Sequence, residues 1–226
     1  MLKTAMKLEI NELEEKDFIA SAVEKTKPDN LILQFSSSLE YSRIAKIFKG
    51  IRAEVRGLGT SLYLMRDGDW DYSLGRCEES ATNLNLLEQF LSLDEIFKPR
   101  GFIIPFEAEP SKYMFNSILD LTVGLVAGIS IKGDFSTYEN WNYFYRKAKN
   151  GLLFTTDSSI YGSDLIDEER IAKKTIMHFL PEPEGLSNEQ RDYIQLLNRY
   201  DSTIYIEGSN NIDSYLENRK KFEGAL

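Results

Sequence analysis

The sequence LILQFSSSLEYSRIAKIFKG, residues 31–50, contains the pattern that is most informative about the fold class. Its first five residues form a short continuous apolar run, which is typical of a buried strand. Ser37 and Glu40 have the spacing of a helix capping box, and apolar residues then recur at helical spacing from Tyr41 to Phe48. The stretch therefore predicts a buried strand, a polar turn and an amphipathic helix.

The same alternation of strands and helices continues on both sides of this unit. Further helices are predicted over 11–25, 83–97, 111–128, 139–150, 164–180, 187–200 and 211–222, and further strands over 101–106, 152–156 and 203–208. Strands that alternate with helices favour an α/β fold with a mixed, mostly parallel sheet flanked by helices. We expect a single α/β domain over residues 1–226, with a hinge at 181–187, PEPEGLS.

Residues 61–80, SLYLMRDGDWDYSLGRCEES, allow two interpretations. Asp-Gly is a preferred two-residue turn, and it would make a β-hairpin insertion around residues 52–75 with aromatic side chains paired across its strands. Alternatively, the spacing of four acidic residues resembles an EF-hand calcium loop, which would use as ligands Asp67, Asp69, Asp71 and Glu78. Such a loop needs glycine at its sixth position, where this chain has Tyr72. The hairpin is therefore the prediction.

Composition limits the classes of function. The net charge of −9 argues against broad binding to nucleic acid or anionic membranes, since both require a basic surface. Cys77 is the only cysteine and His178 the only histidine, which excludes intrachain disulfides, cysteine-based zinc sites and mechanisms with paired histidines. The most apolar run, 118–131, is short for a membrane span and contains Asp120. We expect a soluble, cytoplasmic protein.

Polar residues follow four of the predicted strands. In open α/β sheets, ligands bind beyond the carboxyl ends of parallel strands. A crevice there would be lined by Ser36, Ser38, Glu107, Thr156, Asp157, Glu207 and Ser209. Under this enzyme interpretation the carboxylates hold a divalent metal, in a metal-dependent phosphoester hydrolase or a small-ligand-binding enzyme. The simpler explanation is that these residues form ordinary polar turns and helix caps.

The favoured hypothesis is a non-catalytic interaction or regulatory protein, of an immunity or host-defence accessory type. It needs no cofactor, and its partner would be another protein. Few residues of catalytic type stand in recognisable motifs, whereas tyrosine and tryptophan, which are enriched at interface hot spots, are frequent. In YENWNYFYRK, residues 138–147, helical spacing assigns Trp141, Phe144 and Tyr145 to the core. The predicted contact patch consists of Tyr138, Tyr143, Arg146 and Lys147.

Overall fold

The computed structural model describes residues 3–10, 16–36, 44, 51–66, 70–106, 108–123, 125, 128–132, 139–140, 143–144, 147, 154–155, 177–180, 187–200, 203–206 and 211–225. The strands in these ranges are β1 (Lys3–Ile10), β2 (Asn30–Phe35), β3 (Ser61–Arg66), β4 (Gly101–Pro105), β5 (Gly128–Lys132), β6 (Phe154–Thr155), β7 (Met177–Leu180) and β8 (Thr203–Ile206).

All eight strands form one parallel sheet that closes on itself. The strand order is β6-β5-β4-β3-β2-β1-β8-β7, and every hydrogen-bonded pair is parallel. The two end strands of this order, β6 and β7, contact each other. Eight parallel strands in a closed ring, surrounded by helices, form a TIM-type barrel.

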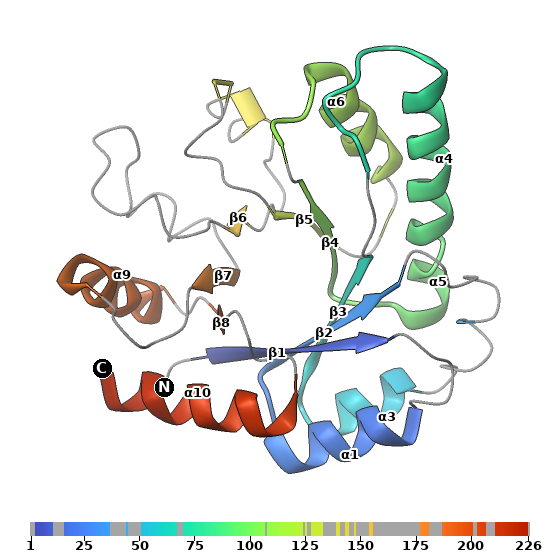
Figure 1. The fold of residues 1–226 in the computed structure, drawn as a ribbon. Helices are drawn as coiled ribbons and strands as arrows, with labels where there is room; N and C mark the ends of the chain where they lie inside the picture. The colour runs from blue at the N-terminus through green and yellow to red at the C-terminus, as the bar shows by residue number, and fades with distance from the viewer. Residues whose placement is uncertain are drawn as a thin grey trace.

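Helices lie outside the strands (Figure 1). The described helices are α1 (Lys16–Thr26), α3 (Ile51–Gly57), α4 (Glu78–Leu91), α5 (Asp94–Phe97), α6 (Lys112–Leu121), α9 (Asn188–Arg199) and α10 (Ile212–Ala225). Local sequence explains several of their ends; at α6, for example, the Ser111 hydroxyl accepts a hydrogen bond from the Met114 amide at 3.1 Å, which is an N-cap. None of these described helices combines the length and apolar character that crossing a membrane requires.

The strands separate two apolar clusters. Successive side chains of a strand point to opposite faces of the sheet. On β2, Leu31 and Leu33 belong to a large cluster that includes helix residues such as Ile19, whereas Ile32 belongs to a second, smaller cluster. The members of that second cluster all come from β1 to β4: Ala5, Ile32, Tyr63, Met65 and Ile103. They define the inside of the barrel, and the first cluster lies between the strands and the helices.

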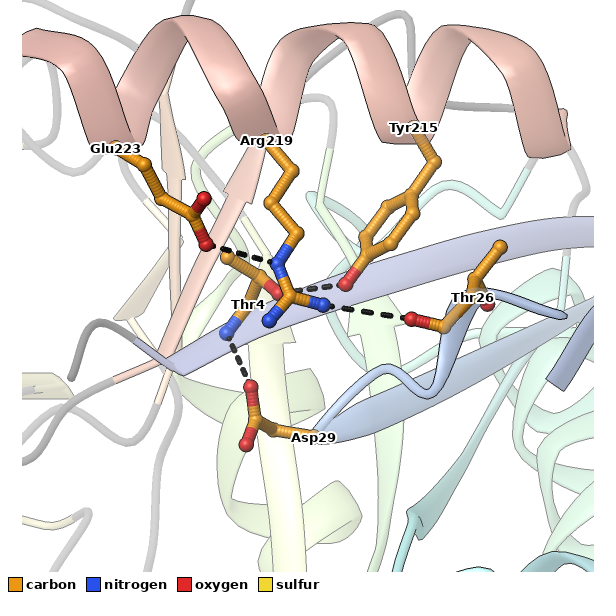
Figure 2. A network of polar contacts seen from close by, with 6 residues as sticks. All are labelled: Thr4, Thr26, Asp29, Tyr215, Arg219 and Glu223. Carbon is orange, nitrogen blue, oxygen red and sulfur yellow. Dashed lines mark hydrogen bonds and ion pairs between the residues drawn. The ribbon is translucent and has the colours of Figure 1, made fainter. Parts of the chain in front are cut away.

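A set of polar contacts joins α10 to the amino end of β1, which we call the amino-end network (Figure 2): Thr4, Thr26, Asp29, Tyr215, Arg219 and Glu223. The hydroxyls of Thr4 and Tyr215 lie 2.6 Å apart, and both residues are buried. The Thr4 amide donates to Asp29 Oδ2 at 2.9 Å, and Arg219 Nη1 donates to the Thr26 carbonyl at 3.3 Å. Because Thr26 ends α1, this guanidinium satisfies a helix C-terminus and links α1 to α10.

The expected fold class is confirmed, but the β-hairpin around residues 52–75 is wrong. Residues 51–57 form helix α3, β3 pairs in parallel with β2 and β4 on its two sides, and residues 70–77 contain no strand. Both edges of β3 are therefore occupied, so no antiparallel partner can pair with it. Two aromatic residues that the hairpin would have paired across its strands pack elsewhere: Trp70 lies edge-on to Phe90 of α4, and Tyr72 lies edge-on to Phe106, which directly follows β4.

The helix predicted over 164–180 is also wrong at its end, since residues 177–180 form strand β7 and His178 lies on this strand. A short apolar segment such as MHFL has no distinctive helical period, and only its pairing with β8 makes it a strand. The helix predicted over 111–128 ends at Leu121, and β5 begins at Gly128. Of the hinge at 181–187, residues 181–186 lie outside the described part of the chain.

Candidate active site

The carboxyl ends of all the strands lie at one rim of the barrel, because every described pairing is parallel. In this fold, active sites are found at that end, where residues at strand ends and in the following loops converge. We call it the carboxyl-end rim. The amino-end network of Figure 2 lies at the start of β1 and is therefore at the opposite end of the barrel.

The inner wall of β1, β2 and β3 is unusually polar near this rim. The register aligns Lys7 with Ile32 and Tyr63, and aligns Glu9 with Gln34 and Met65. Since Ile32, Tyr63 and Met65 lie inside the barrel, their register partners share that face. Barrel interiors of this kind are usually filled by Val, Ile and Leu. We call the polar members of this surface the inner-wall set: Lys7, Glu9, Gln34 and Tyr63.

Lys7 and Glu9 form an ion pair with Nζ and Oε1 3.2 Å apart. The Lys7 side chain is 15% exposed and the Glu9 side chain 42%, so the pair extends from the interior toward the mouth of the barrel. Alternate residues of one strand lie on the same face, which explains why two side chains so close in sequence meet here. The pair places a cationic donor and an anionic acceptor beside each other with little net charge.

Tyr63 and Gln34 each bury a polar atom that has no hydrogen-bond partner among the described residues. These atoms are the Tyr63 hydroxyl and Gln34 Oε1, and the whole Tyr63 residue is only 1% exposed. A buried polar group without a partner costs roughly 1–3 kcal/mol. Such groups are rare in native proteins, and they indicate a bound water, an ion, a ligand or a catalytic role.

Burial raises the pKa of the Tyr63 hydroxyl above its ordinary value, and the nearby charge of Arg100 opposes this effect only in part. The hydroxyl therefore remains protonated at neutral pH and can donate a hydrogen bond to an oxygen atom inside the barrel. Room for the ring comes from the neighbouring strands, since the register partner of Tyr63 on β4 is Gly101, which in turn pairs with Gly128 of β5.

Most residues of the predicted crevice lie outside the described part of the chain: Ser38, Glu107, Thr156, Asp157, Glu207 and Ser209. Ser36 is described; it is half-buried directly after β2, and its amide donates to the Ile10 carbonyl at 3.3 Å. It thus lies at the carboxyl-end rim, between the ends of β1 and β2.

The four residues of the predicted calcium loop are only partly described. Asp67 and Asp69 lie outside the described residues. Asp71 is exposed, and its Oδ1 accepts hydrogen bonds from the Ser73 hydroxyl at 2.5 Å and the Ser73 amide at 2.9 Å, which lower the pKa of the carboxyl. Glu78 is the exposed first residue of α4, where a carboxylate stabilises a helix N-terminus. In the described ranges, no three His, Cys, Asp or Glu residues form a group that could hold a metal ion.

The predicted contact patch is only partly described, with Tyr138 and Arg146 outside the described residues. Tyr143 is bound within the chain: its hydroxyl donates to Asn116 Oδ1 at 2.9 Å, and its ring packs edge-on against Phe115 and Phe144. Lys147 is exposed, with Nζ 5.9 Å from the centre of the Tyr143 ring. Phe144 is buried, as its helical spacing predicted, so this segment anchors to α6.

The sequence interpretation missed the inner-wall set, although a signal for it exists. KTAMKLEI, residues 3–10, alternates polar and apolar residues after its start, which is the pattern of a strand with one polar face. No strand was predicted there, so Lys7 and Glu9 were not considered. Tyr63 was assigned to the hairpin, and Gln34 to a buried strand without a role.

Solved structures of several enzymes share this fold. The chain is similar to D-psicose 3-epimerase from Clostridium cellulolyticum H10, at 10% identity and a TM-score of 0.63 over 100% of this chain and 97% of that one. It is similar to a sugar phosphate isomerase/epimerase from Parabacteroides distasonis ATCC 8503, at 8% identity and a TM-score of 0.63 over 100% and 96%. It is also similar to endonuclease IV from Thermus thermophilus, at 11% identity and a TM-score of 0.64 over 99% and 98%. No protein-family model and no curated protein sequence matches the chain.

These similarities overturn the expectation of a non-catalytic protein that acts through contact with another protein. The chain has, over its whole length, the fold of sugar isomerases and epimerases, and its inner wall carries polar groups of the kind that enzymes use.

Proposed function

We propose that this protein is an enzyme that isomerises or epimerises a sugar or a sugar phosphate, with its active site inside the carboxyl-end rim. The observation that carries the proposal is the inner-wall set, a cluster of polar groups on strands whose usual inner residues are apolar. Two members of the set, Glu9 and Gln34, come next to last in β1 and β2, close to the end of the barrel where this fold places active sites. The similarity to a sugar epimerase and a sugar phosphate isomerase/epimerase supplies the class of reaction.

Glu107, Asp157 and Glu207 are the residues that we propose to hold a divalent cation. They follow the last residues of β4, β6 and β8 closely in sequence, and the carboxyl ends of these strands share the rim. Three carboxylates are hard oxygen donors, which suit Mg²⁺, Mn²⁺ or Ca²⁺. When bound, such a cation would polarise a sugar carbonyl and stabilise the negative charge that develops on its oxygen.

The residues of this chain would supply the remaining functions. Lys7 can donate hydrogen bonds to substrate oxygens, and Glu9 can accept them from hydroxyls. Ser36, at the end of β2, can contact a substrate that enters from the rim. The apolar residues Ile32, Met65 and Ile103 are buried on the same inner surface and would help to exclude water from a bound substrate.

The test is a conversion assay. Purified protein is incubated with D-fructose, D-tagatose, D-allulose and D-fructose 6-phosphate, with and without added Mn²⁺, and products are resolved by NMR. We expect conversion of at least one substrate, loss on chelation, and loss in Glu107→Gln and Asp157→Asn. Glu217→Gln is the matched control, because Glu217 is an exposed carboxylate on α10 whose described partner is Lys221. Activity that survives both rim substitutions would refute the assignment of the carboxylates.

A second candidate is phosphoester hydrolysis, which is favoured by the similarity to endonuclease IV. The same carboxylates would then bind the cation, and the substrate would be a phosphodiester. Hydrolysis of bis(p-nitrophenyl) phosphate or nicking of plasmid DNA, without conversion of any sugar, would select this function. We propose that either reaction takes place in the cytoplasm, in keeping with the free and exposed thiol of Cys77.

A further inference from the structure

The inner-wall set has a donor and acceptor arrangement that matches sugar hydroxyls. A hydroxyl group donates one hydrogen bond and accepts two. The wall offers acceptors at Gln34 Oε1 and Glu9 and donors at Lys7 and Tyr63, whose polar ends lie on the inner faces of three neighbouring strands. Neighbouring hydroxyls of one sugar could therefore contact neighbouring strands at the same time.

Two features indicate that a ligand completes this surface. The Tyr63 hydroxyl and Gln34 Oε1 are buried and have no hydrogen-bond partner in the described part of the chain, so the surrounding residues do not account for them. In addition, the charge of Lys7 is offset by Glu9 at 3.2 Å, so the four members of the inner-wall set carry no excess charge among themselves. A phosphate would be bound poorly here, whereas uncharged hydroxyls are complementary.

We propose that Lys7, Glu9, Gln34 and Tyr63 form a subsite for the uncharged hydroxyl-bearing end of a sugar, distinct from the carboxylates that follow β4, β6 and β8. This inference rests on the proposed function and adds the part of the substrate that the β1–β3 wall recognises. A reacting carbonyl would lie toward the rim, and any phosphate group would lie away from the wall.

The decisive substitution is Tyr63→Phe, which removes one hydroxyl and keeps the ring. Because that hydroxyl has no partner among the described residues, the ligand-free variant should melt at the same temperature as the wild type or higher. Its affinity for D-fructose, D-tagatose or D-allulose, measured by isothermal titration, should fall about tenfold, as expected for one lost hydrogen bond. Gln34→Met keeps the length of the side chain and removes the carbonyl. It should likewise lower the affinity for the sugars without lowering the melting temperature.

Tyr215→Phe is the matched control. It also removes the hydroxyl of a buried tyrosine, but this hydroxyl contacts Thr4 at the amino end of the barrel. The control should melt at a lower temperature than the wild type and bind the sugars with unchanged affinity. Tyr63→Phe, by contrast, should keep or raise the melting temperature and should lower the affinity for the sugars.

The outcomes separate this inference from the proposed function. If the wild type binds a ketose without converting it and Tyr63→Phe weakens that binding, the subsite stands and the proposed reaction is wrong. If the wild type converts a sugar and Tyr63→Phe and Gln34→Met bind it with unchanged affinity, the reaction stands and the subsite is wrong. Absence of binding to any of the three ketoses, binding of D-fructose 6-phosphate alone, or a lower melting temperature for ligand-free Tyr63→Phe would each overturn the subsite.

Discussion

Replacing Tyr215 by Phe tests whether the amino-end network holds α10 against the barrel. The change removes a hydroxyl that lies 2.6 Å from Thr4 Oγ1, and both residues are 2% exposed (Figure 2). The phenyl ring can occupy the space of the phenol, so no cavity of significant size forms. The substitution therefore removes the buried hydrogen bond to Thr4, which leaves Thr4 Oγ1 without this partner, and the interaction of the hydroxyl with the Arg219 side chain.

The expected destabilisation follows from this geometry. Leaving a buried hydroxyl unsatisfied costs about 1–3 kcal/mol, so we expect the free energy of unfolding to fall by about 2 kcal/mol. For a chain of 226 residues, that loss corresponds to a decrease of roughly 4–8 °C in Tm. Urea denaturation followed by circular dichroism would give the free energy, and calorimetry would give Tm.

A double-mutant cycle with Thr4→Val identifies the source of the loss. Thr4→Val removes the other hydroxyl, so the double variant leaves neither group unsatisfied and should be less destabilised than the sum of the two single variants. Tyr113→Phe, on the exposed surface of α6, serves as the control and should leave stability nearly unchanged. Additive effects in the cycle, or a loss below about 0.5 kcal/mol for Tyr215→Phe, would show that the contact does not stabilise the protein.

Three further predictions concern local contacts and pH. Ser111→Ala removes the N-cap of α6 and should lower the free energy of unfolding, measured by urea titration, by about 1 kcal/mol. Ser111→Asp still offers a capping oxygen, so it should keep most of the stability that the cap contributes. Arg219→Met keeps most of the aliphatic stem but loses the bond to the Thr26 carbonyl, and should accelerate amide hydrogen exchange at the end of α1 relative to Lys221→Met. Burial raises the pKa of Tyr63 and of Tyr215, so their contribution to stability is complete below about pH 10, the unfolded value, and is lost as the pH rises through the raised values. The Tm should therefore fall less steeply with rising alkaline pH in the Tyr63→Phe/Tyr215→Phe variant than in the wild type. Thermal melts recorded across alkaline pH test this, and parallel curves of Tm against pH would contradict the prediction.

Local patterns were sufficient to predict much of the secondary structure. The apolar run at 31–35, the capping signal before α9 and the strand predicted over 203–208 each show in a few neighbouring residues. The structure confirms these elements, with the last strand spanning Thr203–Ile206. Alternation of such elements also predicted a mostly parallel sheet flanked by helices, which is confirmed. Each of these elements leaves a signal in the pattern of its own few residues, so the order of residues contains the information.

Errors arose where a segment has two locally acceptable structures. Asp67-Gly68 is compatible with a hairpin turn in isolation, but β3 has parallel neighbours on both sides, which leaves no edge for a returning strand. The segment 177–180 is equally acceptable as the end of a helix until β8 provides hydrogen bonds along it. In both cases the competing structures differ in long-range pairing, which a short window of sequence does not contain.

The candidate site shows the same division. The order of residues is enough to place Lys7, Glu9, Gln34 and Tyr63 on segments able to form strands, and to show that carboxylates follow other strands. Folding alone makes β1, β2 and β3 neighbours in a closed barrel, with a register that turns these four side chains to its inside. Strand alternation defines two faces, but which face becomes the interior depends on closure of the sheet. That closure joins residues from the two ends of the chain, with β1 paired to β8 and β6 in contact with β7.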